Sequence, residues 1–429
     1  MQSKHIKKKF ISESIKYPLI FFLIVLFIFY VYSFYFPIPT PNNDIILGNE
    51  ETVGIGADIL SIGDRNFYFQ EKTSNYGYEN LGIKGSFLYP LILNSLEFIT
   101  SKLGLSSIAW NSLVIFLASL CAILSLFFID KSANIIFEER TANIASWIFV
   151  LCPYTLFYCI SGGITIYMTL GISFFLYLIA KSNIFDSKGF GIKIPLLMVF
   201  VLLNVLFISS LRPTGSIFSI VTIFCLGITI YSKSSRNLIK LSKTEKMVIY
   251  STFAFCLAYC LYQVQTNTSY ISFTVNNFVS EGGTFFGLER ELIRNKIDSF
   301  AVEDFKYLKS YFYLITWKII DFVGGLSDIR DSHATWGITS LFPSMARIFV
   351  GIFIMFPLNL SAFLGIFIYW KKIYYSGLWI NLIAAFSCLA PSLMGVAISR
   401  YLIMVYPPLI ILSAKTFGII IDEFNSQTS

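Results

Sequence analysis

The chain has 429 residues, of which 55% are hydrophobic, 17% are aromatic and only 13% are charged, and its mean hydropathy is +0.69. These values exclude a soluble globular domain and indicate an integral membrane protein. The net charge of +7 does not indicate a nucleic-acid partner, because Lys and Arg gather in short segments between apolar runs, where they set orientation. The seven cysteines lie inside apolar runs and are expected to be packing residues without disulfide bonds.

Ten apolar runs approach the length of about 20 residues that a helix needs to cross a bilayer. We therefore predict an all-α, polytopic membrane protein with about ten transmembrane helices, forming a single domain over residues 1–429. No small-residue cleavage site follows the first run, which indicates a retained signal anchor. In chain order the predicted spans are 17–36, 107–129, 143–160, 164–180, 194–211, 214–231, 247–265, 345–370, 377–398 and 401–421.

Basic residues alternate with the spans and predict the orientation of the chain. They precede the first span and recur in the loops at 181–193, 233–246 and 371–372. Because positive charge is retained on the cytoplasmic side, we expect a multi-pass protein of the cell membrane with both termini in the cytoplasm.

Two long segments, 37–106 and 266–344, then lie on the non-cytoplasmic face. Each contains an apolar run interrupted by charges, at 87–103 and 305–322, which is typical of a helix lying along the membrane surface. The functional site is expected on this face.

Two arginines are predicted at the non-cytoplasmic boundary, where anchoring does not require positive charge. Arg212 directly follows the run 194–211, and Arg400 lies between the last two spans. A guanidinium near hydrocarbon is costly without an anionic partner, and its planar donors suit phosphate or carboxylate. Both are therefore candidate phosphate ligands; pairing with lipid headgroups or with a structural acid is the alternative.

The first long segment also supplies two acids, Asp58 and Asp64. A carboxylate held beside a membrane-facing pocket could take a proton from an acceptor hydroxyl; a solvated loop acid is the alternative. His333 lies in a charged cluster on the same face, which is either an acceptor site or a salt-bridged loop. Since the chain has only two histidines, neither a Ser/His/Asp triad nor a multi-histidine metal site can be assembled.

Several short motifs follow one another in a recognisable order. They are Asp64 to Tyr68 (Asp-x-x-x-Tyr), Gly77-Tyr78, Tyr89 to Ile92 (Tyr-Pro-Leu-Ile), Leu151 to Tyr158, Arg212 to Gly215 (Arg-Pro-x-Gly), Arg400-Tyr401 and Tyr406-Pro407. This order resembles the GT-C superfamily of glycosyltransferases over most of the chain, especially the GPI-mannosyltransferase-like and dolichyl-phosphate-mannose-protein-mannosyltransferase-like members. Two departures are the absence of an Asp-x-Asp or Glu-x-Asp metal motif in the first long segment and the unmatched segment 266–344.

The resemblance implies a GT-C-like fold and an inverting, metal-independent glycosyltransferase of the hexosyltransferase type. Such an enzyme transfers a sugar from a polyprenyl-phosphate-linked donor to a glycan, lipid or protein acceptor of the cell envelope. A polymerase of lipid-linked polysaccharide repeat units, a transporter or flippase of a lipid-linked saccharide, and a non-catalytic scaffold are the alternatives.

The resemblance also implies roles for individual residues. Asp64 or Asp58 would act as the general base, and Arg400, supported by Arg212, would neutralise the phosphate without a cofactor. The remaining implied substrate contacts are Tyr68, Tyr401 and His333.

Overall fold

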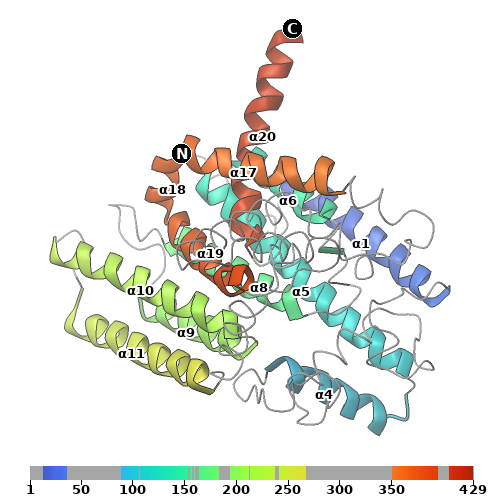
Figure 1. Cartoon of the computed structure of the whole chain (residues 1–429), viewed down its shortest axis with the longest axis horizontal. Coiled ribbons are helices and arrows are strands. Elements are labelled where there is room, and N and C mark those ends of the chain that lie inside the picture. The colour runs from blue at the N-terminus through green and yellow to red at the C-terminus, as the bar shows by residue number, and fades with distance from the viewer. Residues whose placement is uncertain are drawn as a thin grey trace, which may run out of the picture.

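The structure is a computed structural model, and it describes residues 13–35, 88–105, 107–152, 155–156, 159, 164–182, 194–211, 213–236, 241–266, 350–394 and 405–428. Within these ranges the regular elements are helices (Figure 1), in agreement with the predicted all-α class. In chain order they are α1 (Glu13–Tyr35), α4 (Leu88–Lys102), α5 (Ser107–Ile136), α6 (Glu139–Leu151), α8 (Ile164–Ser182), α9 (Ile194–Leu211), α10 (Pro213–Ser235), α11 (Lys243–Thr266), the π-helical turn η3 (Val350–Met355), α17 (Phe356–Ile368), α18 (Trp370–Ser376), α19 (Leu378–Met394) and α20 (Tyr406–Thr428).

Each of the ten predicted spans overlaps a helix in the described part of the chain. By length and composition, five of the described helices can cross a membrane, namely α5, α8, α9, α10 and α11. The count becomes six if Phe353–Ile368 and α18, which are bent by 81° relative to each other, form one span. Shorter apolar segments occur in α1 and α19. The count of ten spans stays a prediction.

The predicted span 143–160 is broken. Helix α6 ends at Leu151, and Cys152 has an extended backbone with φ −65° and ψ 119°. Pro153 follows, and the residue before a proline is biased away from helical geometry because the proline ring would clash with it. Hydropathy does not register this break, which is why the run appeared continuous in the sequence.

Contacts between α1 and α5 show that these helices run antiparallel. Near the start of α1, Ser14 Oγ donates a hydrogen bond to Asp130 Oδ1 near the end of α5, at 2.5 Å. Near the opposite ends, the hydroxyl oxygens of Tyr30 and Ser112 lie 2.7 Å apart. The helix bundle therefore has two ends, one beside Asp130 and one beside Ser112.

We call the end beside Asp130 the basic end, because all the described Lys and Arg residues except Lys102 lie towards this side, most of them at helix ends or corners. The other we call the opposite end. The residues of the basic end are Lys16, Lys131, Arg140, Lys181, Lys233, Arg236, Lys243, Lys246, Lys371, Lys372 and Lys415.

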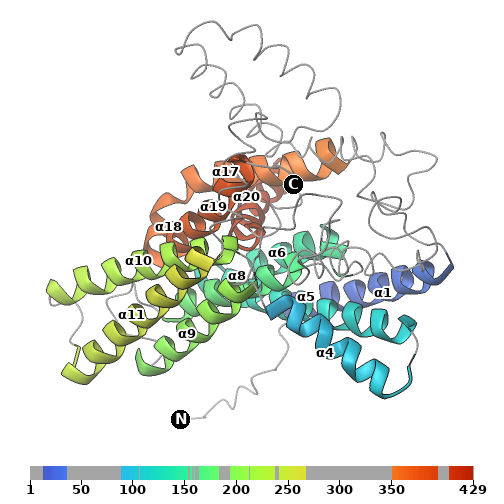
Figure 2. The same cartoon turned by 60° about the horizontal axis from the view of Figure 1, so that its bottom comes forward.

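Helices α8, α9 and α10 approach one another closely around Ile208 of α9. A Cβ atom added at Gly171 of α8 would lie 2.4 Å from Ile208 Cγ1, and one added at Gly215 of α10 would lie 2.1 Å from the Ile208 carbonyl oxygen. Neither glycine therefore has room for a side chain. Figure 2 shows α9, α10 and α11 side by side, in agreement with their mutual contacts.

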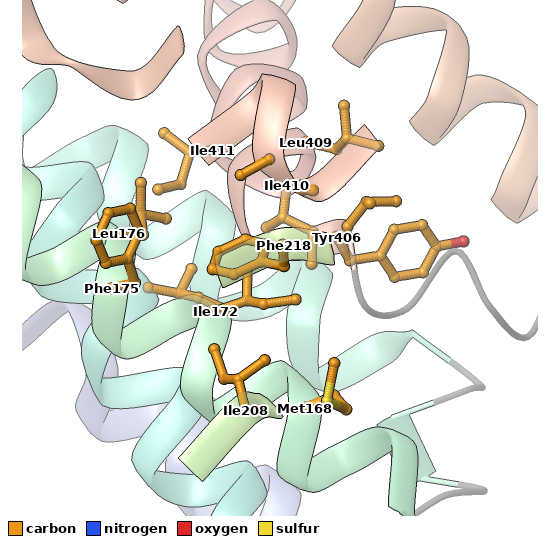
Figure 3. Packing of buried hydrophobic residues seen from close by; sticks show 14 of the residues in the cluster. Met168, Ile172, Phe175, Leu176, Ile208, Phe218, Tyr406, Leu409, Ile410 and Ile411 are labelled. Atoms are coloured by element: carbon orange, nitrogen blue, oxygen red, sulfur yellow. The ribbon is translucent and has the colours of Figure 1, made fainter. Parts of the chain in front are cut away.

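The start of α20 packs into the core beside α8 and α10 (Figure 3). Phe175 of α8 and Phe218 of α10 pack edge to face there, with ring centroids 5.8 Å apart. Tyr406, Leu409 and Ile410 of α20 are all fully or nearly fully buried. The last turns of α20 project beyond the other helices (Figure 1), and Ile420 is exposed.

At the basic end, the corner between α5 and α6 holds α20 by charge pairs. Lys415 Nζ donates a hydrogen bond to Glu138 Oε1 and lies 6.0 Å from the Phe137 ring centroid. Arg140 pairs with Asp422 one to two turns further along α20. The Lys415 hydrogen bond and charge lower the pKa of the Glu138 carboxyl below its ordinary value.

We predict that Gly215→Ala destabilises the fold, because its new methyl group would meet the backbone of α9 at 2.1 Å. The expected loss is about 2 kcal/mol or more, the size of an overpacking strain, measured as a lower unfolding midpoint in detergent. Gly418→Ala is the control, since its Cβ would meet Ile144 Cδ1 at an ordinary 3.6 Å and alanine favours helix. Equal midpoints for both variants would contradict the close contact.

We also predict that the Glu138 contact is pH dependent. Because Lys415 lowers the pKa of this carboxyl in the folded state, its stabilisation is present above the ordinary pKa of a glutamate and is lost as the pH falls through the lowered pKa. Glu138→Gln should lower the free energy of unfolding by no more than about 1 kcal/mol at neutral pH, since the pair is largely exposed. This difference should disappear in acid. Glu139→Gln, at the neighbouring exposed acid, should show a smaller difference; a Glu138→Gln effect independent of pH would refute the ion pair.

Candidate functional site

The seven residues that the sequence marks as a site lie outside the described residues, so their relative positions stay predictions. The structure does describe the helices on either side of the segments that carry most of them. The seven are Asp58, Asp64, Tyr68, Arg212, His333, Arg400 and Tyr401.

Arg212 is the single residue between α9, which ends at Leu211, and α10, which begins at Pro213. Proline suits the first position of a helix, because its φ angle is already helical and it lacks an N–H that would need a partner. Gly215 then allows α10 to begin directly against the α9 backbone. The Arg-Pro-x-Gly motif thus has a steric explanation, whatever Arg212 binds.

The first turn of α10 carries hydrogen-bonding groups that find no partner in the described part of the chain. The first N–H groups of a helix have no acceptor within the helix, and they favour anions. The Thr214 and Ser216 hydroxyls are buried, with relative exposures of 8% and 0%, and neither has a hydrogen-bond partner among the described residues. Because a buried unpaired hydroxyl costs about 1–3 kcal/mol, these groups indicate a ligand, a water molecule or a further side chain beside this turn.

The helix that precedes the segment with Arg400 contacts the same turn. Cys388 of α19 donates an Sγ–H hydrogen bond to the Thr214 carbonyl oxygen at 3.4 Å. Tyr406, the first residue of α20, is fully buried and donates to Met355 Sδ at 3.6 Å. The described helix ends that flank residues 395–404 therefore lie towards the opposite end of the bundle, since Cys388 contacts the first turn of α10 and Tyr406 lies nine residues before Lys415 of the basic end.

The first long segment is attached at this end as well. Its Tyr-Pro-Leu-Ile motif forms the start of α4, so the predicted surface helix 87–103 is a helix in the structure. Tyr89 is fully buried and packs edge to face on Tyr167 near the start of α8, with ring centroids 5.5 Å apart. The Tyr167 hydroxyl is buried and has no hydrogen-bond partner in the described part of the chain.

Sequence reasoning missed some of these residues. Thr214 belongs to a quoted motif, but Tyr167, Ser216 and Cys388 lie within apolar runs and carry no pattern of their own. Among the described residues there is no group of three or more His, Cys, Asp or Glu side chains that could hold a metal ion.

Comparisons with known proteins give only remote likenesses. No protein-family model matches the sequence, and no curated protein matches it. Among solved structures, the oligosaccharyltransferase AglB from Archaeoglobus fulgidus in complex with an inhibitory peptide and a dolichol-phosphate is similar, with a TM-score of 0.45, 13% identity, and coverage of 96% of this chain and 52% of that chain.

Two further structures of an oligosaccharyltransferase from the same organism are also similar. The apo form has a TM-score of 0.45, 14% identity and coverage of 94% and 51% of the two chains. The form tethered to an acceptor peptide containing the NVT sequon has a TM-score of 0.41, 14% identity and coverage of 94% and 50%. This chain spans about half the length of these structures, and TM-scores below 0.5 do not establish a shared fold.

Proposed function

We propose that this chain is a membrane glycosyltransferase that moves a sugar from a polyprenyl-phosphate-linked donor to a hydroxyl of a glycan, lipid or protein acceptor. The observation that carries the proposal is that three segments with candidate residues are attached at the opposite end of the bundle. These are 36–87 between α1 and α4, Arg212 between α9 and α10, and 395–404 between α19 and α20. The basic end is the cytoplasmic one under the positive-inside bias, so the site faces away from the cytoplasm.

The first turn of α10 is the proposed phosphate site. Its free N–H groups and the positive end of the helix dipole favour an anion, and the hydroxyls of Thr214 and Ser216 can donate to phosphate oxygens. Arg212 adjoins this turn in the chain, and Arg400 belongs to the segment that Cys388 and Tyr406 anchor nearby. A guanidinium supplies paired donors and a permanent charge.

The proposed reaction is a single displacement. Asp64 or Asp58 takes the proton of the acceptor hydroxyl as its oxygen attacks the anomeric carbon on the face opposite the phosphate. The bond between that carbon and the phosphate oxygen breaks, polyprenyl phosphate leaves with the electron pair, and the sugar inverts. Arg400 stabilises the charge that develops on the phosphate, the role a metal ion has elsewhere. The remaining candidates would contact sugar or acceptor: Tyr68, Tyr401 and His333.

A polymerase of lipid-linked repeat units would use the same phosphate site and differ in its acceptor. A transporter or a scaffold would need no general base. The variants below therefore separate catalysis from binding.

Arg400→Ala is expected to weaken donor binding and lower turnover together, because a lost phosphate contact affects both the bound donor and the transition state. Arg400→Lys should recover little, since one ammonium does not replace a bidentate fork. Arg212→Ala should act in the same direction more weakly. Arg236→Ala, beyond the other end of α10, is the matched control. Donor affinity and single-turnover rates in reconstituted protein measure these effects; unchanged affinity in Arg400→Ala would remove that residue from the phosphate site.

Asn substitution at one of the two acids, Asp58 or Asp64, should lower turnover about 100-fold or more, the usual size of lost general-base catalysis. Donor binding should stay nearly intact, because the base contacts the acceptor. Asp44→Asn, in the same segment, is the control. Wild-type turnover in both Asn variants, with the protein folded and inserted, would place the base elsewhere and favour the transporter or scaffold.

A further inference from the structure

A strip of partly exposed aromatic rings runs across α5, α8 and α9 in the half of the bundle nearer the basic end. Phe128 of α5 packs on Phe174 and Tyr177 of α8, with ring centroids 5.0 and 5.5 Å apart. Phe174 packs edge to face on Phe200 of α9 at 5.9 Å. All four rings are half-buried. We call these four residues the aromatic strip.

Two lysines stand at the basic end of the aromatic strip. Lys181 Nζ lies 5.2 Å from the Tyr177 ring centroid, and Lys131 Nζ lies 5.5 Å from the centroid of Phe127, which packs on Phe128 at 5.8 Å. Each lysine is on the same helix face as its ring, four residues further on.

The two lysines lie at a similar height in the membrane. Helices α5 and α8 both run from the opposite end towards the basic end, and Phe128 of one touches Tyr177 of the other. Lys131 and Lys181 follow these rings by three and four residues, a rise of about 5 Å in each helix. Both lysines therefore lie nearer the basic end than the rings, as expected of side chains that reach the headgroup region from a partly exposed apolar surface.

Lys131 is partly balanced by a neighbouring acid. Asp130 Oδ2 lies 3.7 Å from Lys131 Nζ, and the Asp130 side chain is fully buried, whereas that of Lys131 is 25% exposed. Asp130 also accepts the hydrogen bond of Ser14, so its carboxylate interacts with a buried hydroxyl as well as with Lys131. Lys181 is exposed. Lys131 and Lys181, taken together with Asp130, therefore keep a net positive charge at the surface.

We propose that Lys131, Lys181 and the aromatic strip bind one anionic phospholipid of the leaflet at the basic end. The lysines hold its phosphate, and an acyl chain lies along Phe128, Phe174 and Phe200. A charged pair above an apolar strip matches an anionic headgroup above a hydrocarbon chain, and basic sites between transmembrane helices select such lipids. This inference does not rest on the proposed function.

The test uses the full chain in nanodiscs of phosphatidylcholine, titrated with phosphatidylglycerol. Lipid retained by the protein is counted by native mass spectrometry, and the unfolding midpoint is followed in parallel. We expect one phosphatidylglycerol retained per wild-type chain, with a rise in the midpoint. The double change Lys131→Gln and Lys181→Gln should weaken phosphatidylglycerol binding about 10-fold or more, and Lys131→Arg with Lys181→Arg should restore it.

The matched control is the double change Lys371→Gln and Lys372→Gln on α18, which removes the same charge at the same end of the bundle away from the strip. It should leave the retained lipid unchanged. Phe174→Leu tests the strip itself and should weaken retention while both charges remain. Equal losses in the two Gln pairs, or wild-type retention in the Lys131 and Lys181 pair, would overturn the site. Displacement of phosphatidylglycerol by polyprenyl phosphate at equal or lower concentration would also overturn the assignment of this ligand.

Discussion

The arrangement of the opposite end depends on one backbone contact, between the carbonyl of Ile208 and Gly215. Because Gly215 has no side chain, α10 can begin one residue after α9 ends and still lie against it. Gly171 brings α8 onto the same isoleucine. Within a bilayer, apolar burial does not by itself favour contact with another helix over contact with lipid. Small residues favour helix association there because they let the backbones pack closely. The position of the α10 first turn, and with it Arg212 in the chain, follows from this contact.

Some buried hydroxyl groups pair between helices, whereas others have no partner among the described residues. Ser209 donates to Ser219 at 3.0 Å across α9 and α10, and the Ser361 and Ser413 hydroxyls lie 2.6 Å apart across α17 and α20. Such pairing is expected where no water reaches. By contrast, the Thr214 hydroxyl has no partner among the described residues. The hydroxyls of Ser146, Ser173 and Thr222 also lack a partner among these residues, so an unpaired hydroxyl does not by itself mark a ligand site. Thr214 and Ser216 are distinguished by their place in the first turn of α10.

The basic end uses its charges for orientation and for holding helices together. The Lys415 and Arg140 pairs join α20 to the corner between α5 and α6. Several lysines also lie over aromatic rings at this end, including Lys371 over Trp370 at 5.7 Å, as expected where amphipathic side chains reach the headgroup region. The described cations other than Lys102 thus gather on one side, where they join helices and reach the headgroup region.

The sequence by itself determined the class of the protein and the position of most helices, because apolar length and flanking charge are local properties. The run 194–211 coincides with α9, and 164–180 falls within α8. Motif order selected five of the seven candidate residues, and Asp58 and His333 were chosen as charged or titratable groups on the predicted outer face; all seven lie outside the described part of the chain. Only the tertiary structure decided which helix ends share a face and that the buried hydroxyls of Tyr167 and Ser216 find no partner within the described ranges. Those outcomes depend on contacts between distant segments, such as Gly215 with Ile208 and Cys388 with Thr214, and a hydroxyl in an apolar run looks the same whether it is paired or not.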